Sequence, residues 1–152
     1  MKNIIVTGGL GFIGSNLIEL LILKKFKVIN VDKVTYSSNF YNTKEYAKNK
    51  NYKFVKCDLN NKKKLNKIIF EYKPAGIFNL AAETHVDRSI DNPTNFINSN
   101  IMGVFNLLEV FKKYSKINNK SKLIHISTDE VFGDILKGRS HEKFPYKPSS
   151  PY

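Results

Sequence analysis

Short apolar runs alternate along this chain with longer segments whose apolar residues recur at helical spacing. The short runs predict five β-strands, at residues 3–7, 27–32, 52–57, 75–80 and 122–127. The longer segments predict helices over residues 12–23, over residues 61–72, and from Pro93 to about residue 113. Residues 33–51 and 133–151 are polar and predict loops, the first with a short helix.

The order of these elements predicts an α/β fold with a Rossmann-like, doubly wound parallel sheet. Crossovers of this length join parallel strands, and helices then cover both faces of the sheet. A complete dinucleotide-binding sheet has six strands, whereas the pattern here gives five. We therefore expect residues 1–152 to form one incomplete Rossmann domain, truncated after the fifth strand.

The helix that begins at Pro93 has the strongest amphipathic pattern. Its apolar residues recur at steps of four, three, four and three, namely at Ile97, Ile101, Val104, Leu108 and Phe111. This spacing places all of them along one face of the helix.

Composition narrows the class of protein. The chain has 152 residues, of which 41% are hydrophobic and 25% charged, as in soluble globular domains. No apolar run approaches the ~20 residues of a membrane span, and the opening residues resemble a strand and a glycine turn rather than a secretory signal. A lone cysteine, Cys57, excludes an internal disulfide framework. We expect a cytoplasmic protein that does not enter membranes.

The net charge of +12 would ordinarily suggest a nucleic-acid partner. However, 23 Lys, 18 Asn and 16 Ile together point to an A/T-rich genome, since all three residues have A/T-rich codons. The lysines are also spread along the chain, and the run at 62–64 suits the solvated face of a helix. We therefore expect no nucleic-acid partner. The three histidines lack the spacing of metal ligands, so we expect no metal.

A glycine-rich loop lies between the first strand and the first helix. Gly8, Gly11 and Gly14 would allow a tight turn, close approach to a pyrophosphate and tight helix packing. The helix N-terminus would then face the phosphates. Asp32 ends the second strand, where its carboxylate can bind both ribose hydroxyls and repel a 2′-phosphate, although Lys33 next to it weakens that argument. The pattern predicts dinucleotide binding and favours NAD.

Two further polar groups follow predicted strands. Asp58 comes after the third strand, where it could accept a hydrogen bond from an adenine amino group, but it could equally be a turn residue. Thr128, Asp129 and Glu130 follow the fifth strand, at the edge where open parallel sheets bind ligands. A neutral carboxyl that donates a proton beside an ionised one that abstracts would suit acid–base catalysis. Without context, such a pair is more often solvated surface.

Six segments, in order, resemble the dTDP-glucose 4,6-dehydratase family of the extended short-chain dehydrogenase/reductase superfamily. They are TGGLGFIGSN at 7–16, VDKVTYSSN at 31–39, CDL at 57–59, LAAETHVDRSIDNP at 80–93, ISTDEVFGD at 126–134 and PYKPSSPY at 145–152. The resemblance implies NAD as cofactor and a nucleotide-sugar, dTDP-glucose, as substrate. The NAD-binding residues that it implies are Gly8, Gly11, Phe12, Ile13, Gly14, Asp32, Lys33, Val34, Thr35, Asp58, Leu59, Leu80, Ala81, Ala82, Thr84 and Ser99.

The resemblance also implies the catalytic residues. Thr128 would bind the sugar hydroxyl being oxidised, Asp129 would be the general acid and Glu130 the general base. Tyr152 matches the catalytic tyrosine, and Thr84 and His85 would lie near the substrate. The implied reaction is oxidation at C4 with hydride transfer to NAD, elimination of water across C5–C6, and return of hydride to C6.

One departure from the family's pattern affects this interpretation. The catalytic tyrosine of the superfamily belongs to a Tyr-x-x-x-Lys motif, and here the sequence given ends at Tyr152. We therefore expect the 152 residues alone to lack turnover and the C-terminal substrate-binding region. The family forms homodimers through the long helix, which the resemblance leaves open for this chain. The alternatives are a non-catalytic NAD-binding fragment, or another nucleotide-sugar enzyme such as a UDP-sugar dehydratase or 4-epimerase.

Overall fold

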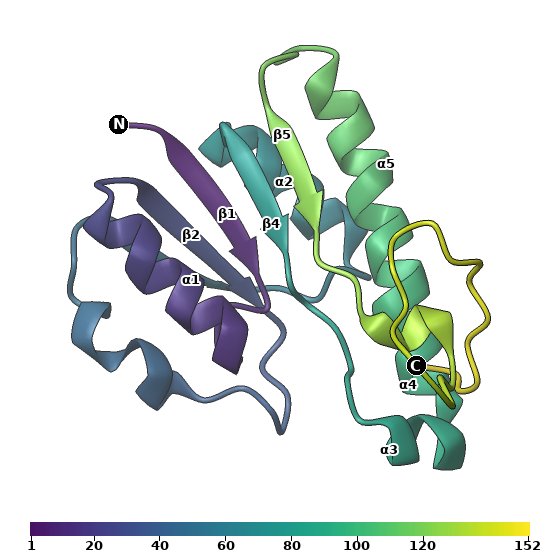
Figure 1. The fold of residues 1–152 in the computed structure, drawn as a ribbon. Coiled ribbons are helices and arrows are strands. Elements are labelled where there is room, and N and C mark those ends of the chain that lie inside the picture. The colour runs from purple at the N-terminus through teal and green to yellow at the C-terminus, as the bar shows by residue number, and fades with distance from the viewer.

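The computed structural model describes all residues 1–152 and shows one parallel sheet between two layers of helices (Figure 1). The strands are β1 (Asn3–Thr7), β2 (Lys27–Asp32), β3 (Tyr52–Lys56), β4 (Gly76–Asn79) and β5 (Lys122–His125). They pair in the order β3-β2-β1-β4-β5, and every pair is parallel. This is the strand order of a doubly wound dinucleotide-binding sheet without its sixth strand, which confirms the predicted fold class.

The α-helices are α1 (Phe12–Leu23), α2 (Lys62–Tyr72), α3 (Val86–Asp91), α4 (Pro93–Phe96) and α5 (Val104–Ser115). The 3₁₀ helices are η1 (Phe40–Tyr46) and η3 (Asp129–Phe132), and η2 (Ile97–Gly103) is a π-helix. Because α4, η2 and α5 follow one another directly, they form the single long helix predicted from Pro93. The polar stretch after β4 was expected to be loop, but it contains α3, whose Ser89 is fully buried.

The hydrophobic core lies on both faces of the sheet, because successive strand residues point to opposite sides. Ile5, Ile29 and Ile77 face α2 and α5, where they join one buried cluster with Leu65 and Leu107. On the other face, a second buried cluster holds Ile4, Val6 and Val28 together with Ile18 and Leu21 of α1. Burial on both faces explains why the central strands are almost continuously apolar.

The long helix has two apolar faces rather than one. Its buried face consists of Leu107, Val110 and Tyr114, which join the cluster beneath the sheet. The face predicted from the sequence points outward instead: Ile101 is 59% exposed and Leu108 is 48% exposed. The dimer contact that the family resemblance implies for this helix stays a prediction.

The carboxyl ends of all five strands meet at one edge, so the loops that follow them are brought together there. The C-terminal segment returns to this edge, since Lys147 N–H donates to the Val131 carbonyl at 2.9 Å and the Ser149 hydroxyl to Asp134 at 3.0 Å. The chain end consequently lies beside α4 (Figure 1). None of the helices combines the length and the apolar character needed to span a membrane.

Candidate functional site

A cavity of about 690 Å³ opens at the carboxyl edge of the sheet, within the size range of small-molecule sites. The loops after β1, β2, β4 and β5 line it, together with the π-helix η2. Seventeen residues that the sequence nominated line this one cavity: Gly8, Gly11, Phe12, Ile13, Gly14, Asp32, Lys33, Thr35, Asp58, Leu59, Leu80, Ala81, Ala82, Thr84, Ser99, Thr128 and Tyr152.

The glycine loop is packed too tightly for any side chain at two positions. A Cβ atom at Gly14 would lie 2.3 Å from the Gly8 carbonyl oxygen, far inside van der Waals contact. Gly8 adopts a φ of +70°, and a Cβ there would lie 2.8 Å from the Cα of Ala81. Gly11 is the N-cap of α1 and supplies no capping side chain. The first-turn N–H groups of α1 are therefore available for an anionic ligand at the cavity wall.

The buried carboxylate of Asp32 joins two loops of the cavity. Its Oδ2 accepts a hydrogen bond from the Leu10 N–H at 3.1 Å, in the glycine loop. Its Oδ1 accepts from the Val34 N–H at 2.8 Å and from the Ser38 hydroxyl at 2.9 Å, both in the loop after β2. A carboxylate has about four acceptor positions, so Asp32 can still accept from a ligand hydroxyl.

Val34 occupies an unfavourable backbone conformation next to Asp32. Its φ is +65°, in the left-handed region that a β-branched side chain rarely adopts. Such strain costs on the order of 1–3 kcal/mol and persists only where neighbouring interactions hold it. Here the hydrogen bond to Asp32 holds Val34, and Thr35 N–H donates to the Ser38 hydroxyl at 3.0 Å. Val34 lines a second cavity of about 540 Å³ that adjoins the first.

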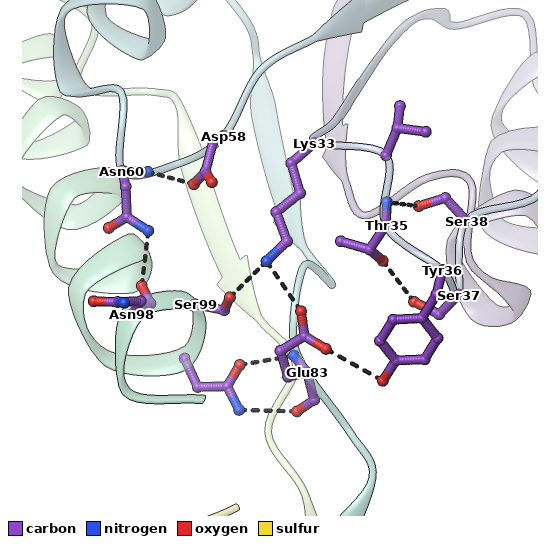
Figure 2. Close-up of polar contacts among 12 residues, drawn as sticks. Lys33, Thr35, Tyr36, Ser37, Ser38, Asp58, Asn60, Glu83, Asn98 and Ser99 are labelled. Carbon is purple, nitrogen blue, oxygen red and sulfur yellow. Dashed lines mark hydrogen bonds and ion pairs between the residues drawn. The ribbon is translucent and has the colours of Figure 1, made fainter. Parts of the chain in front are cut away.

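An ion pair crosses the crevice between the loop after β2 and the loop after β4 (Figure 2). The Lys33 ammonium lies 3.0 Å from Glu83 Oε1 and donates to the Ser99 hydroxyl at 2.8 Å. Tyr36 donates from its hydroxyl to Glu83 Oε2 at 3.3 Å. The Asn100 amide fixes the Glu83 backbone through hydrogen bonds to its N–H and its carbonyl, each 2.9 Å. Glu83 is a site residue that sequence reasoning missed, although an acid directly after an apolar strand run was a usable signal.

Asp58 and Cys57 lie where the two cavities meet. Asp58 accepts a hydrogen bond from the Asn60 N–H at 2.8 Å, which shapes the turn before α2. Burial raises the pKa of the Cys57 thiol above its usual value, as does the nearby Asp58, while Lys64 acts in the opposite direction. Cys57 lines both cavities, so its thiol can report on their occupancy.

The predicted catalytic residues separate into two groups. Thr128 and Tyr152 line the main cavity, and the Tyr152 ring packs edge-on against Phe96 at 6.4 Å between centroids. Asp129 and Glu130 lie on η3 outside the cavity wall, where the Thr128 hydroxyl caps the turn by accepting from the Glu130 N–H at 3.2 Å. Their proton-transfer roles stay predictions.

His85 also lies outside the wall of the main cavity, beside Tyr36, with 5.9 Å between ring centroids. Its nearness to the substrate therefore stays a prediction. No group of three or more His, Cys, Asp or Glu side chains is arranged to hold a metal ion.

Ten residues of the main cavity were not nominated from the sequence. They are Val31, Ser37, Ser38, Cys57, Asn100, Val104, His125, Ile126, Ser127 and Val131. His125 was interpreted as a structural strand residue. Its Nδ1 lies 2.8 Å from the Asn79 amide, and the Thr7 hydroxyl donates to Asn79 in turn. The signal for these residues was their place at the carboxyl ends of strands rather than any motif.

The strand order, the glycine loop and the cavity at the carboxyl edge together define a Rossmann-like domain of the doubly wound class. The sequence also matches the family model described as GDP-mannose 4,6 dehydratase over residues 5–152. This chain belongs to that family. The match confirms the resemblance drawn from the six sequence segments.

Curated relatives and solved structures agree with the family match. The chain is 43% identical to the dTDP-glucose 4,6-dehydratase of Neisseria meningitidis, with 100% of this chain and 45% of the relative covered. The corresponding values for the Haemophilus influenzae dTDP-glucose 4,6-dehydratase are 44%, 100% and 47%. The chain thus spans about half the length of the curated relatives it matches.

Among solved structures, the dTDP-glucose 4,6-dehydratase of Bacillus anthracis in complex with NAD superposes with a TM-score of 0.86 at 40% identity, covering 100% of this chain and 46% of that one. The Thermus thermophilus UDP-glucose 4-epimerase complex with NAD gives 0.85 at 30% identity, covering 99% and 46%. The fold alone therefore does not separate a dehydratase from an epimerase.

We expect Gly14→Ala to lower the free energy of unfolding by about 1–3 kcal/mol, because its Cβ would force the glycine loop apart. Gly76→Ala is the matched control, since its Cβ would lie 3.4 Å from the Ile4 Cδ1 in ordinary contact. Urea denaturation of both variants measures the difference. Equal stability of the two would contradict the packing described for the loop.

We expect the Cys57 thiol to react slowly with iodoacetamide near neutral pH, because burial raises its pKa and the thiolate is the nucleophile. The rate should rise as pH increases toward and beyond that raised pKa. Rates measured by mass spectrometry in the folded and urea-unfolded chain give the comparison. Equal rates in both states at pH 8 would show that Cys57 is not protected.

Proposed function

We propose that this chain is the NAD-binding part of a nucleotide-sugar 4,6-dehydratase that acts on dTDP-glucose. The observation that carries this proposal is the convergence of seventeen independently nominated residues on one cavity. The printed names of the relatives from Neisseria meningitidis and Haemophilus influenzae support the substrate. A Bacillus anthracis structure described as a complex with NAD supports the cofactor.

The residues present fit a dinucleotide. The tight turn at Gly14 and the uncapped first turn of α1 bring backbone N–H groups to the wall, where a pyrophosphate can bind. Asp32 has acceptor capacity left for the adenosine ribose hydroxyls, and Asp58 lies near enough to the second cavity to accept from an adenine amino group. When bound, NAD supplies a hydride acceptor and, once reduced, a hydride donor.

The chain's own residues would move the protons of the reaction. Thr128 would hydrogen-bond the C4 hydroxyl of the sugar, and Tyr152 would take the proton from that oxygen. Glu130 would abstract the proton at C5, while Asp129 would protonate the C6 oxygen as it leaves as water. Positioned acid–base groups contribute ~10²–10⁴-fold to such steps.

We propose further that residues 1–152 form an incomplete domain for this chemistry. Asp129 is exposed on η3, and a general acid and base need an enclosed site to take opposite roles. The chain matches 45% of the Neisseria meningitidis relative, so the rest of such a protein is available to enclose the pair. A nucleotide-sugar would then bind between the two parts.

A 4-epimerase is the second candidate, because an epimerase superposes on this fold as closely as the dehydratases do. An epimerase eliminates no water and needs no acid–base pair at Asp129 and Glu130. The presence of both carboxyls directly after Thr128 favours the dehydratase. A binding module without catalysis would retain the cavity and would not need the pair at all.

We expect the purified chain to bind one NAD⁺ in isothermal titration calorimetry. Asp32→Asn should weaken binding about 10–100-fold, since hydrogen bonds to a charged group are worth roughly 1.5–3 kcal/mol. Asp91→Asn, an exposed position on α3, is the matched control for the loss of a carboxylate. Thermal unfolding of each variant separates a lost ligand contact from a lost fold. Absence of NAD⁺ binding by the folded wild-type chain would overturn the proposal.

The dehydratase activity can be tested by joining residues 1–152 to the part of the Neisseria meningitidis relative that they do not match. We expect this chimera to convert dTDP-glucose to its 4-keto-6-deoxy product, and Glu130→Gln to lower kcat about 10²–10⁴-fold. Mass spectrometry detects the loss of water. Formation of an isomer from UDP-glucose, with no dehydration, would assign the epimerase instead. Turnover by residues 1–152 alone would contradict the incomplete domain.

A further inference from the structure

We propose that Glu83 determines which dinucleotide the cavity accepts, by neutralising Lys33. With this pair formed, the cavity would accept a dinucleotide with a free ribose 2′-hydroxyl and reject one with a 2′-phosphate there. The inference rests on the proposed NAD function and names a residue that acts through another, so Glu83 is a specificity-determining positioning residue rather than a catalytic one.

The first argument is the charge of the cavity wall. Although the chain carries a net charge of +12, Lys33 is the only lysine or arginine that lines the main cavity. Two carboxylates, Asp32 and Asp58, line the same wall. With Lys33 paired to Glu83, the wall is net negative, and an added phosphate dianion is repelled.

The second argument is the place of Lys33. It directly follows Asp32, whose carboxylate would bind the ribose hydroxyls, and a basic side chain near that acid is what accommodates a 2′-phosphate in dinucleotide folds. Its ammonium instead points across the crevice toward Glu83 and Ser99 (Figure 2), with distances of 3.0 and 2.8 Å. Two of its three N–H donors are thereby used.

The third argument is that Glu83 is held rigidly in place. Its side chain is only 9% exposed, while that of Lys33 is 33% exposed. Asn100 fixes its backbone from both sides, and Tyr36 donates to its second carboxylate oxygen. The Arg88 guanidinium lies over the Tyr36 ring at 4.1 Å and braces that side chain. The carboxylate therefore stays where the ammonium must meet it, unlike a mobile surface pair.

The proposal predicts charge-dependent changes of opposite sign. Glu83→Gln keeps the size of the side chain and an oxygen that accepts from Lys33, but it leaves the ammonium unneutralised. The ratio of the NADP⁺ and NAD⁺ dissociation constants should then fall about tenfold. Lys33→Met leaves Glu83 unneutralised, and the same ratio should rise by a similar factor. The ratio cancels the pyrophosphate, which both cofactors share.

The double variant Glu83→Gln with Lys33→Met restores neutrality, and its ratio should return to the wild-type value. Glu71→Gln removes an exposed carboxylate at the far end of α2 and should change nothing. All constants are measured by calorimetry on residues 1–152 at one fixed salt concentration, with thermal unfolding recorded for each variant.

Three results would overturn the inference. An unchanged ratio in Glu83→Gln, or in Lys33→Met should the first variant fail to fold, would leave NAD⁺ binding intact and remove this role of Glu83. Shifts of the same sign in both single variants would show a purely structural clasp. A gain that persists in the double variant would assign the 2′-phosphate to Lys56 or Lys64, which line the adjoining cavity. Binding of neither cofactor by the wild-type chain would instead overturn the proposed function and, with it, this inference.

Discussion

The hydrogen bonds to the buried Asp32 carboxylate are the interaction on which the candidate site depends. They join the glycine loop, through Leu10, to the loop after β2, through Val34 and Ser38. A buried carboxylate without such partners would cost several kcal/mol, so the fold requires both loops to approach it. The left-handed backbone of Val34 is stable only because this carboxylate holds its N–H. The shape of the cavity thus follows from satisfying one buried charge.

The second half of the cavity depends on the meeting of Glu83 with Lys33. This pair spans the crevice that Asp32 leaves open, and Ser99 of the π-helix η2 joins it. The wide turn of η2 also leaves the Asn98 carbonyl free to accept from Asn60 at 3.0 Å, which ties η2 to the turn before α2. Local departures from regular helix are common where a site needs particular side chains. The irregular part of the long helix is therefore the part that lines the cavity.

Sequence patterns predicted the parts of this structure that local physics decides. The strands, α1, α2 and the glycine loop follow from residue periodicity and from turns that only glycine can make. Asp32 could be identified because it lies at a fixed distance from that loop. Glu83, Asn100 and His125 could not, because their roles arise only when β4, β5 and η2 come together in space. The outer face of α5 was also ambiguous, since Leu107 and Leu108 are equally apolar and only packing distinguishes them.

The two kinds of candidate residue differ in how the fold supports them, and this difference bears on the chemistry. Residues for the cofactor are buried, hydrogen-bonded and joined across the sheet, so their positions are fixed before any ligand arrives. Asp129 and Glu130 are on one 3₁₀ turn, held mainly by the Thr128 cap. A carboxylate in contact with water cannot easily be kept as a donor beside an ionised partner. The same residues can therefore bind a dinucleotide as they stand, whereas elimination of water requires the acid pair to be enclosed by substrate and by further protein.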